Sequence, residues 1–170
     1  MLKCLQIGLL GLGGILASIS LSPIALSQPA NFSGRFYRFQ TQFTGSMKCL
    51  DIVNDGNNDR LIMANCGNYS GQLWSIKDTD GSYRLRTQFT GSNKCLDIVN
   101  DGRNNKLVMA DCGDYTGQFW IIKPSGNGFY RLQTQFTGNK KCLDIVNDGK
   151  NNQLTMADCG NYSGQFWKIF

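Results

Sequence analysis

The sequence predicts an all-β protein made of three copies of one four-stranded unit, and three observations lead to this prediction. The stretch from Cys49 to Trp74 returns from Cys95 to Trp120 and again from Cys142 to Trp167. Each copy holds two cysteines at the same spacing and ends in Gln-x-Trp. Aromatic and polar residues alternate before each copy, and no segment after the first 27 residues has helical periodicity. A repeat of this period indicates one supersecondary unit that is used several times.

The first unit illustrates the elements, which the other two units repeat. Alternating residues followed by a Thr-Gly turn predict its first strand, and segments rich in Asn, Asp and Gly separate the later strands. The predicted strands are 36–43, 48–53, 60–66 and 72–77. The first strands of the second and third units begin at Tyr83 and Tyr130.

The N-terminal segment has the features of a secretory signal. Lys3 precedes an apolar run from Leu5 to Ile19, and small residues end the segment near Ser27. Glycine and serine interrupt the run and Pro23 ends it, which disfavours an uncleaved membrane anchor. We therefore expect a secreted or periplasmic protein. The expected divisions are a signal peptide over 1–27, a short leader over 28–35, and one domain over 36–170 with repeats 36–82, 83–129 and 130–170.

The cysteines are expected to form one local disulfide in each unit. Of the seven cysteines, Cys4 leaves with the signal, and the remaining six allow 15 pairings. A threefold repeat favours one local rule used three times, and an exported protein keeps such bonds oxidised. The chain contains no histidine, and the cysteine pairs lack the spacing of a zinc site. The predicted bridges are Cys49–Cys66, Cys95–Cys112 and Cys142–Cys159, with no metal and no cofactor.

Charge and composition disfavour several functional classes. The formal net charge of +5 is spread singly along the chain, whereas a nucleic-acid site needs a clustered basic face. The segment that starts at Asp51 resembles a calcium loop, but Val53 and Ile62 stand where oxygen ligands belong. The absence of histidine excludes the usual catalytic triads, and a glycosidase needs two carboxylates in different environments rather than equivalent sites. We therefore expect a protein that is not an enzyme.

Three four-stranded units favour one closed architecture. A propeller needs at least about four blades, so three units cannot close one. A β-trefoil closes with three units, because two strands from each form a six-stranded barrel and the other two form hairpins that cap one end. Closure removes the exposed strand edges. The sequence therefore predicts a β-trefoil with pseudo-threefold symmetry and a core of repeated Leu, Ile, Phe and Trp side chains.

The Cys-Leu-Asp motif, the glycine-containing turn, the second cysteine and Gln-x-Trp together resemble the ricin-type β-trefoil lectins. The resemblance covers essentially the whole chain after the signal. It implies carbohydrate binding, with up to one shallow sugar pocket in each unit. It also implies that the Gln and Trp of Gln-x-Trp mainly hold each unit together: Gln72, Trp74, Gln118, Trp120, Gln165 and Trp167.

The residues suggest how such a pocket is built. If Cys49 lies opposite Cys66 in an antiparallel ladder, Asp51 lies opposite Ala64, and a carboxylate beside a small residue makes a recess with an acceptor in it. Sugar hydroxyls can donate to both carboxylate oxygens. Tyr69 is the nearest aromatic residue that offers a flat surface. The alternative interpretations are that Asp51 accepts hydrogen bonds from the following turn and that Tyr69 covers the disulfide.

The spacing of the site residues is closest to the actinohivin-like three-repeat bacterial lectins, which recognise high-mannose glycans. Alanines stand where the galactose-binding branch places its stacking aromatic residue, so mannose-type and galactose-type glycans both remain open. The resemblance implies one Asp, one Asn or Asp, and one Tyr in each unit. These candidate sugar-binding residues are Asp51, Asn65, Tyr69, Asp97, Asp111, Tyr115, Asp144, Asp158 and Tyr162.

These observations together predict a secreted lectin that binds glycans through up to three equivalent sites. The second unit and the third carry Asp where the resemblance expects Asn, and simple strand alternation turns Asn65 away from Asp51. We expect a monomer with no nucleic-acid or membrane partner once the signal is removed. The alternative function is a trefoil that contacts proteins, such as an inhibitor of an extracellular hydrolase. Inhibitors usually present one distinctive loop, whereas these units differ little.

Overall fold

The computed structural model of the chain describes residues 31–34 and 36–170. The predicted signal segment, Cys4 and the first residues of the predicted leader lie outside the described residues. Within them the chain forms thirteen short strands and four 3-10 turns. No helix in this described part is long and apolar enough to span a membrane.

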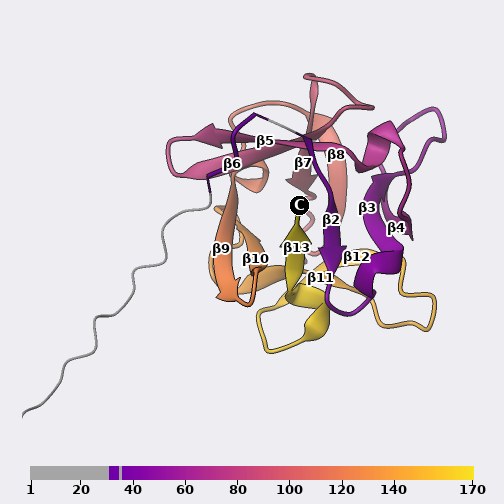
Figure 1. Ribbon diagram of the computed structural model, residues 1–170. Helices are drawn as coiled ribbons and strands as arrows, with labels where there is room; N and C mark the ends of the chain where they lie inside the picture. Colours follow the sequence, from indigo (N-terminus) through magenta and orange to yellow (C-terminus); the bar gives the residue numbers. More distant parts are fainter. Residues whose placement is uncertain (1–30, 35) are drawn as a thin grey trace, which may run out of the picture.

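The strands form one barrel and three separate hairpins, as predicted for a β-trefoil (Figure 1). The barrel strands are β1 (Phe36–Tyr37), β2 (Phe39–Thr41), β5 (Trp74–Thr79), β6 (Ser82–Thr87), β9 (Trp120–Gly126), β10 (Phe129–Thr134) and β13 (Trp167–Ile169). The hairpins are β3 (Lys48–Ile52) with β4 (Leu61–Asn65), β7 (Lys94–Ile98) with β8 (Leu107–Asp111), and β11 (Lys141–Ile145) with β12 (Leu154–Asp158). The 3-10 turns are η1 (Gly45–Met47), η2 (Ser70–Gln72), η3 (Thr116–Gln118) and η4 (Ser163–Gln165).

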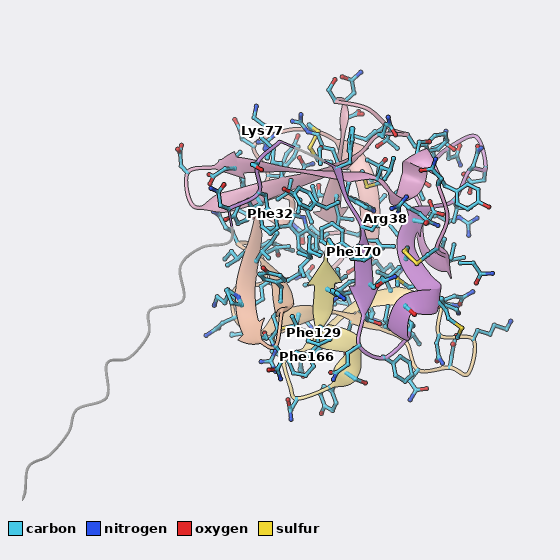
Figure 2. The ribbon with its side chains drawn as sticks, in the orientation of Figure 1. Phe32, Arg38, Lys77, Phe129, Phe166 and Phe170 are labelled. Carbon is cyan, nitrogen blue, oxygen red and sulfur yellow. A yellow bond between two sulfur atoms is a disulfide. The ribbon has the colours of Figure 1, made fainter. Side chains whose placement is uncertain are left out.

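The first predicted strand closes the barrel by dividing between two neighbours. Its first half, β1, pairs with β5, and its second half, β2, pairs with β13 near the C-terminus. Arg38 lies between the halves and exchanges backbone hydrogen bonds of 2.8 and 3.2 Å with Phe170, beside which it lies in Figure 2. Because β1 and β2 are parts of one strand, the seven strand segments make the six-stranded barrel that the sequence predicts.

The tryptophans of Gln-x-Trp lie at the centre of the molecule. Trp74, Trp120 and Trp167 are fully buried, and each indole nitrogen donates to a leucine carbonyl of the same unit's first hairpin strand, at 2.9–3.0 Å. This bond satisfies the one polar atom of the ring, so the ring can be buried without an unpaired donor. Each tryptophan thus joins a barrel strand to a hairpin of its own unit.

The disulfide prediction is confirmed, but the predicted strand register is wrong. All three units contain the expected bridge. Cys49 lies opposite Ala64, not Cys66, and Asp51 lies opposite Ile62. Cys66 follows the end of β4, where its backbone nitrogen donates to Met47, and the bridge therefore runs diagonally across the ladder with a Cα–Cα distance of 4.9 Å. The recess between Asp51 and Ala64 is consequently not formed.

The turn inside each hairpin is organised by an aspartate that accepts backbone hydrogen bonds. Asp55, Asp101 and Asp148 accept from the backbone nitrogens of Asn58, Asn104 and Asn151 at 2.8–3.1 Å. These bonds favour the charged form and lower the pKa of each carboxyl group below its ordinary 3.8.

A lowered pKa makes the stability of the domain sensitive to acid. The stabilisation from these carboxylates is fully present above pH 3.8, and it is lost as the pH falls through the lowered folded-state pKa values. We expect carboxyl titrations followed by NMR to give midpoints below 3.8 for all three groups. The Asp101→Asn variant is expected to lose less stability than the wild type as the pH falls below 3.8. Midpoints at or above 3.8 would contradict this interpretation.

Candidate functional site

A shallow pocket of about 470 Å³ lies on the side of the second unit. It is bounded by the end of β7, the turn that follows it, the loop that leads into η3, and one phenylalanine from the third unit. The residues that line it are Asp97, Ile98, Asn100, Asp114, Tyr115, Thr116, Gly117 and Phe136. Asp97 and Tyr115 are both candidates from the sequence, and the structure brings them together.

The carboxylate of Asp97 is held in place by two donors and keeps further acceptor capacity. The backbone nitrogen of Ile98 donates to Oδ1 at 2.7 Å, and Nε2 of Gln118 donates to Oδ2 at 2.9 Å. The two oxygens of a carboxylate offer about four lone-pair directions, so about two stay available to a ligand. Asp97 is half-buried rather than enclosed, and it lines the pocket.

The donor on Asp97 differs from the one considered in the alternative interpretation. The following turn does not hold the carboxylate; the backbone nitrogen of Ile98 and the glutamine of Gln-x-Trp do. Gln118 also donates to the carbonyl of Asp111 at 2.9 Å and accepts from the backbone nitrogen of Gly113 at 3.0 Å. Gln118 is therefore both a structural residue, as the resemblance implies, and the residue that orients the carboxylate.

Two glycines give the carboxylate and the tyrosine their positions. A Cβ atom on Gly117 would collide with Oδ1 of Asp97, and one on Gly113 would collide with the ring of Tyr115. The ring of Tyr115 thus lies directly against the backbone of Gly113 and remains 64% exposed. An aromatic ring that is supported on one side and exposed on the other is a surface on which the C–H face of a sugar can pack.

The phenylalanine in the pocket comes from the neighbouring unit and was missed by sequence reasoning. Phe136 follows β10, and its backbone nitrogen donates to the carbonyl of Thr116 in η3 at 3.2 Å. A second pocket, of about 370 Å³, lies on the third unit and contains Asp144, Tyr162 and Phe43 of the first unit. Each of these two pockets therefore needs the contact between units. The signal was present as the Thr-Gln-Phe that recurs at Thr41, Thr87 and Thr134.

The first unit repeats the geometry of the other two. Nε2 of Gln72 donates to Oδ2 of Asp51 at 2.8 Å, and the backbone nitrogen of Ile52 donates to Oδ1 at 2.8 Å. Tyr69 is 62% exposed and lies against Gly67, as Tyr162 lies against Gly160. The structure thus holds the candidate Asp and the candidate Tyr in matching positions in all three units.

The third candidate of each unit lies at the end of the second hairpin strand and does not line the two pockets described above. The side chain of Asp111 pairs with Lys94 at 2.9 Å, and that of Asp158 pairs with Lys141 at 3.5 Å. Asn65, Asp111 and Asp158 are exposed, and their backbone carbonyls accept from the glutamines of Gln-x-Trp. The side chains are turned away from the aspartates of the pockets, as simple strand alternation predicts.

The role of Gln118 leads to a specific prediction. Replacement by leucine fills similar space but removes the donor to Asp97, so the carboxylate loses its orientation and the Asp111 carbonyl loses a buried partner. We expect stability to fall by about 1–3 kcal/mol and the affinity of the second unit for its ligand to fall about tenfold or more. Urea unfolding and ligand titration of Gln118→Leu measure both effects. Unchanged affinity at the second site would show that Gln118 serves the fold alone.

Comparison with known proteins agrees with the fold and the repeated motifs. The family model of the ricin-type beta-trefoil lectin domain matches residues 36–167. No curated protein matches the sequence.

Solved structures of the same fold share little sequence with this chain. The designed threefold-symmetric protein ThreeFoil has a TM-score of 0.68 and 23% identity over 79% of this chain and 96% of its own. An exo-beta-1,3-galactanase from Clostridium thermocellum has a TM-score of 0.69 and 18% identity over 81% of this chain but only 30% of its own. A Polyporus squamosus lectin, solved with a sialylated epitope, has a TM-score of 0.63 and 18% identity over 82% of this chain and 50% of its own. The chain therefore spans nearly all of ThreeFoil but half or less of the other two proteins.

Proposed function

The chain belongs to the ricin-type β-trefoil lectin domain family, and from this premise we propose that it is a multivalent lectin with one shallow sugar site in each of its three units. The observation that supports the proposal most is the pairing of a half-buried aspartate with an exposed tyrosine in each unit. Sugars present hydroxyl donors on their edges and C–H groups on their faces. An acceptor beside a supported aromatic ring complements both kinds of surface.

In this proposal, the residues of each site contact different parts of the sugar. Asp97 accepts hydrogen bonds from two neighbouring hydroxyls of a pyranose through the lone pairs that Ile98 and Gln118 leave available. Tyr115 packs on one face of the sugar ring. Phe136 bounds the apolar side of the pocket, and Asn100 and Asp114 lie at its polar rim. The expected ligand is a mannose-type or a galactose-type glycan, which are the two classes that the resemblance of the sequence implies.

Weak individual sites become effective through their number. A shallow pocket covers little of a ligand, so each site is expected to bind a single sugar weakly. Three sites fixed on one rigid barrel can engage a branched or repetitive glycan together and gain about 10²–10⁴ in avidity. We propose that the protein acts by this binding alone, as a secreted or periplasmic monomer, without catalysis.

A glycan array probed with the chain from residue 28 onward tests the proposal. We expect binding to mannose-rich or galactose-rich polyvalent glycans and its loss when the matching free monosaccharide is added in excess. Loss on competition separates a sugar site from a nonspecific basic surface. The alternative function predicts a different outcome, namely no glycan binding and a tight one-to-one complex with an extracellular hydrolase that sugar does not disturb.

A further inference from the structure

The turns inside the three hairpins bind the units to one another in a closed ring. The carbonyl oxygen of Asp59 in the first unit accepts from the backbone nitrogen of Met109 in the second, at 2.8 Å. Asn105 of the second unit accepts from Met156 of the third, and Asn152 of the third accepts from Met63 of the first, each at 2.9 Å. Each turn thus reaches the next unit around the pseudo-threefold axis, and strands β4, β8 and β12 pack against one another there.

Strand alternation indicates that the side chains at these three positions face the inside of the ring. In the first unit, residue 59 lies two before Leu61 and four before Met63, and the ladder extends to residue 60 because Val53 donates to its carbonyl. Alternation along an extended chain places residues 59, 61 and 63 on the same side. Met63 is buried in the core and Leu61 packs against it. The same spacing in the other two units turns Asn105 and Asn152 toward the axis.

This region contains buried oxygen atoms with no hydrogen-bond donor. The side-chain Oδ1 atoms of Asn105 and Asn152 are buried, and no described residue donates to them. The preceding asparagine of each turn also has a buried Oδ1 without a donor: Asn58, Asn104 and Asn151. A buried acceptor that lacks a donor costs about 1–3 kcal/mol, so five of them in one repeated structure need a partner.

We propose that the side-chain oxygens at positions 59, 105 and 152 form a binding site for a hard cation on the pseudo-threefold axis. The donors are oxygens only, which is the ligand set that Ca²⁺ and other hard cations prefer. Asp59 stands at the position equivalent to Asn105 and Asn152 and supplies the one carboxylate. Among the described residues, no group of three or more His, Cys, Asp or Glu side chains could hold a metal, so the amide oxygens are the main ligands.

One of the turns already attracts a positive charge. Nζ of Lys48 donates to the carbonyl of Lys150 at 2.7 Å and to that of Asn151 at 3.3 Å. In the other two units the equivalent lysines, Lys94 and Lys141, pair with aspartates instead. The oxygen-rich surface of the turn is therefore suited to cations even outside the ring.

The site would bind the three units together rather than bind sugar. A cation that contacts Asp59, Asn105 and Asn152 links all three units. The binding site exists only in the folded protein, because its ligands come from different units. With one carboxylate among the ligands, a Kd for Ca²⁺ of about 10⁻⁴–10⁻³ M is expected. Calcium at ten times that Kd lowers the unfolding equilibrium constant about tenfold.

Urea unfolding of the chelator-treated, disulfide-bonded protein tests the proposal without any sugar. The curves are recorded in CaCl₂, in NaCl and in tetramethylammonium chloride at equal ionic strength. We expect a higher midpoint in CaCl₂, in NaCl or in both than in tetramethylammonium chloride, and the two salts identify which cation is bound. Equal midpoints in all three salts would overturn the proposal.

Two sets of variants locate the effect. The double variant Asn105→Ala, Asn152→Ala is expected to abolish the dependence on the cation, whereas Asn57→Ala, an exposed asparagine of the same kind of turn, keeps it. If the alanine variant does not fold, Asn105→Asp with Asn152→Asp provides the second test. Three carboxylates on the axis are expected to raise the affinity for Ca²⁺ at least tenfold, as measured by calorimetry. An unchanged affinity, or an axis that holds only a water in a crystal grown with CaCl₂, would contradict a cation site.

Discussion

Reduction of the three disulfides is expected to unfold the domain. Each bridge joins cysteines 17 residues apart within one unit. A loop of this size is worth about 3 kcal/mol, so the three together contribute about 9 kcal/mol. Folded domains are stable by only about 5–15 kcal/mol in total, so a loss of about 9 kcal/mol is expected to unfold this domain. One cysteine of each pair is also fully buried, so reducing the bridge leaves a thiol in the core and disturbs the packing there.

Fluorescence of the buried tryptophans with and without a thiol reductant measures the effect. The reduced protein is expected to show exposed tryptophans at room temperature, while the oxidised protein stays folded. The single-bridge variant Cys95→Ala, Cys112→Ala is expected to lose about one third of this stabilisation, because the bridges lie in separate units and their effects add. A reduced protein with an unchanged urea midpoint would show that packing alone holds the barrel together.

Much of the fold follows from the repeats, because the same local sequence signals occur in all three units. The turn residues, the alternating strands and the cysteine spacing predict a closed β-trefoil with one bridge per unit, and the structure confirms both. The register was mispredicted because a disulfide need not join directly opposite residues. Cys66 lies just beyond the end of β4, and its bond to Cys49 crosses the ladder diagonally.

The candidate site was predicted only in part, since one of its walls depends on how the units pack. Asp97 and Tyr115 belong to one unit, and the resemblance of the repeated motifs to known lectins implied both of them. Phe136 belongs to the next unit, and the recurring Thr-Gln-Phe marks it as a repeated position without indicating that barrel closure places it against η3. The orienting role of Gln118 was also invisible in the sequence, because Gln118 and Asp97 meet only when the hairpin packs on the barrel.

Removal of the pocket aspartates is expected to have the largest effect on binding. A hydrogen bond to a charged group contributes about 1.5–3 kcal/mol, so Asp97→Ala is expected to weaken the second site about tenfold to a hundredfold for a single sugar. The loss of binding to a polyvalent glycan is expected to be stepwise. Each removed site takes away one point of attachment, and the avidity gain of about 10²–10⁴ is lost in steps. The triple variant Asp51→Ala, Asp97→Ala, Asp144→Ala is expected to retain no measurable binding.

Two further substitutions separate the pocket from the rest of the surface. Asp78→Ala removes the same charge from β5, outside the pocket, and is expected to leave binding unchanged. Asp111→Ala removes an exposed carboxylate that pairs with Lys94, and the geometry predicts a smaller loss than for Asp97→Ala. Urea midpoints of all variants, measured in parallel, show whether a loss of binding reflects a loss of folding.

The most direct test of the account is surface plasmon resonance on one polyvalent mannose-type or galactose-type glycan with the wild type and with the single, double and triple aspartate variants. The account predicts that affinity falls further with each aspartate removed, while Asp78→Ala binds like the wild type. Equal affinity across the whole series, in variants that remain folded, would contradict a sugar site at these aspartates.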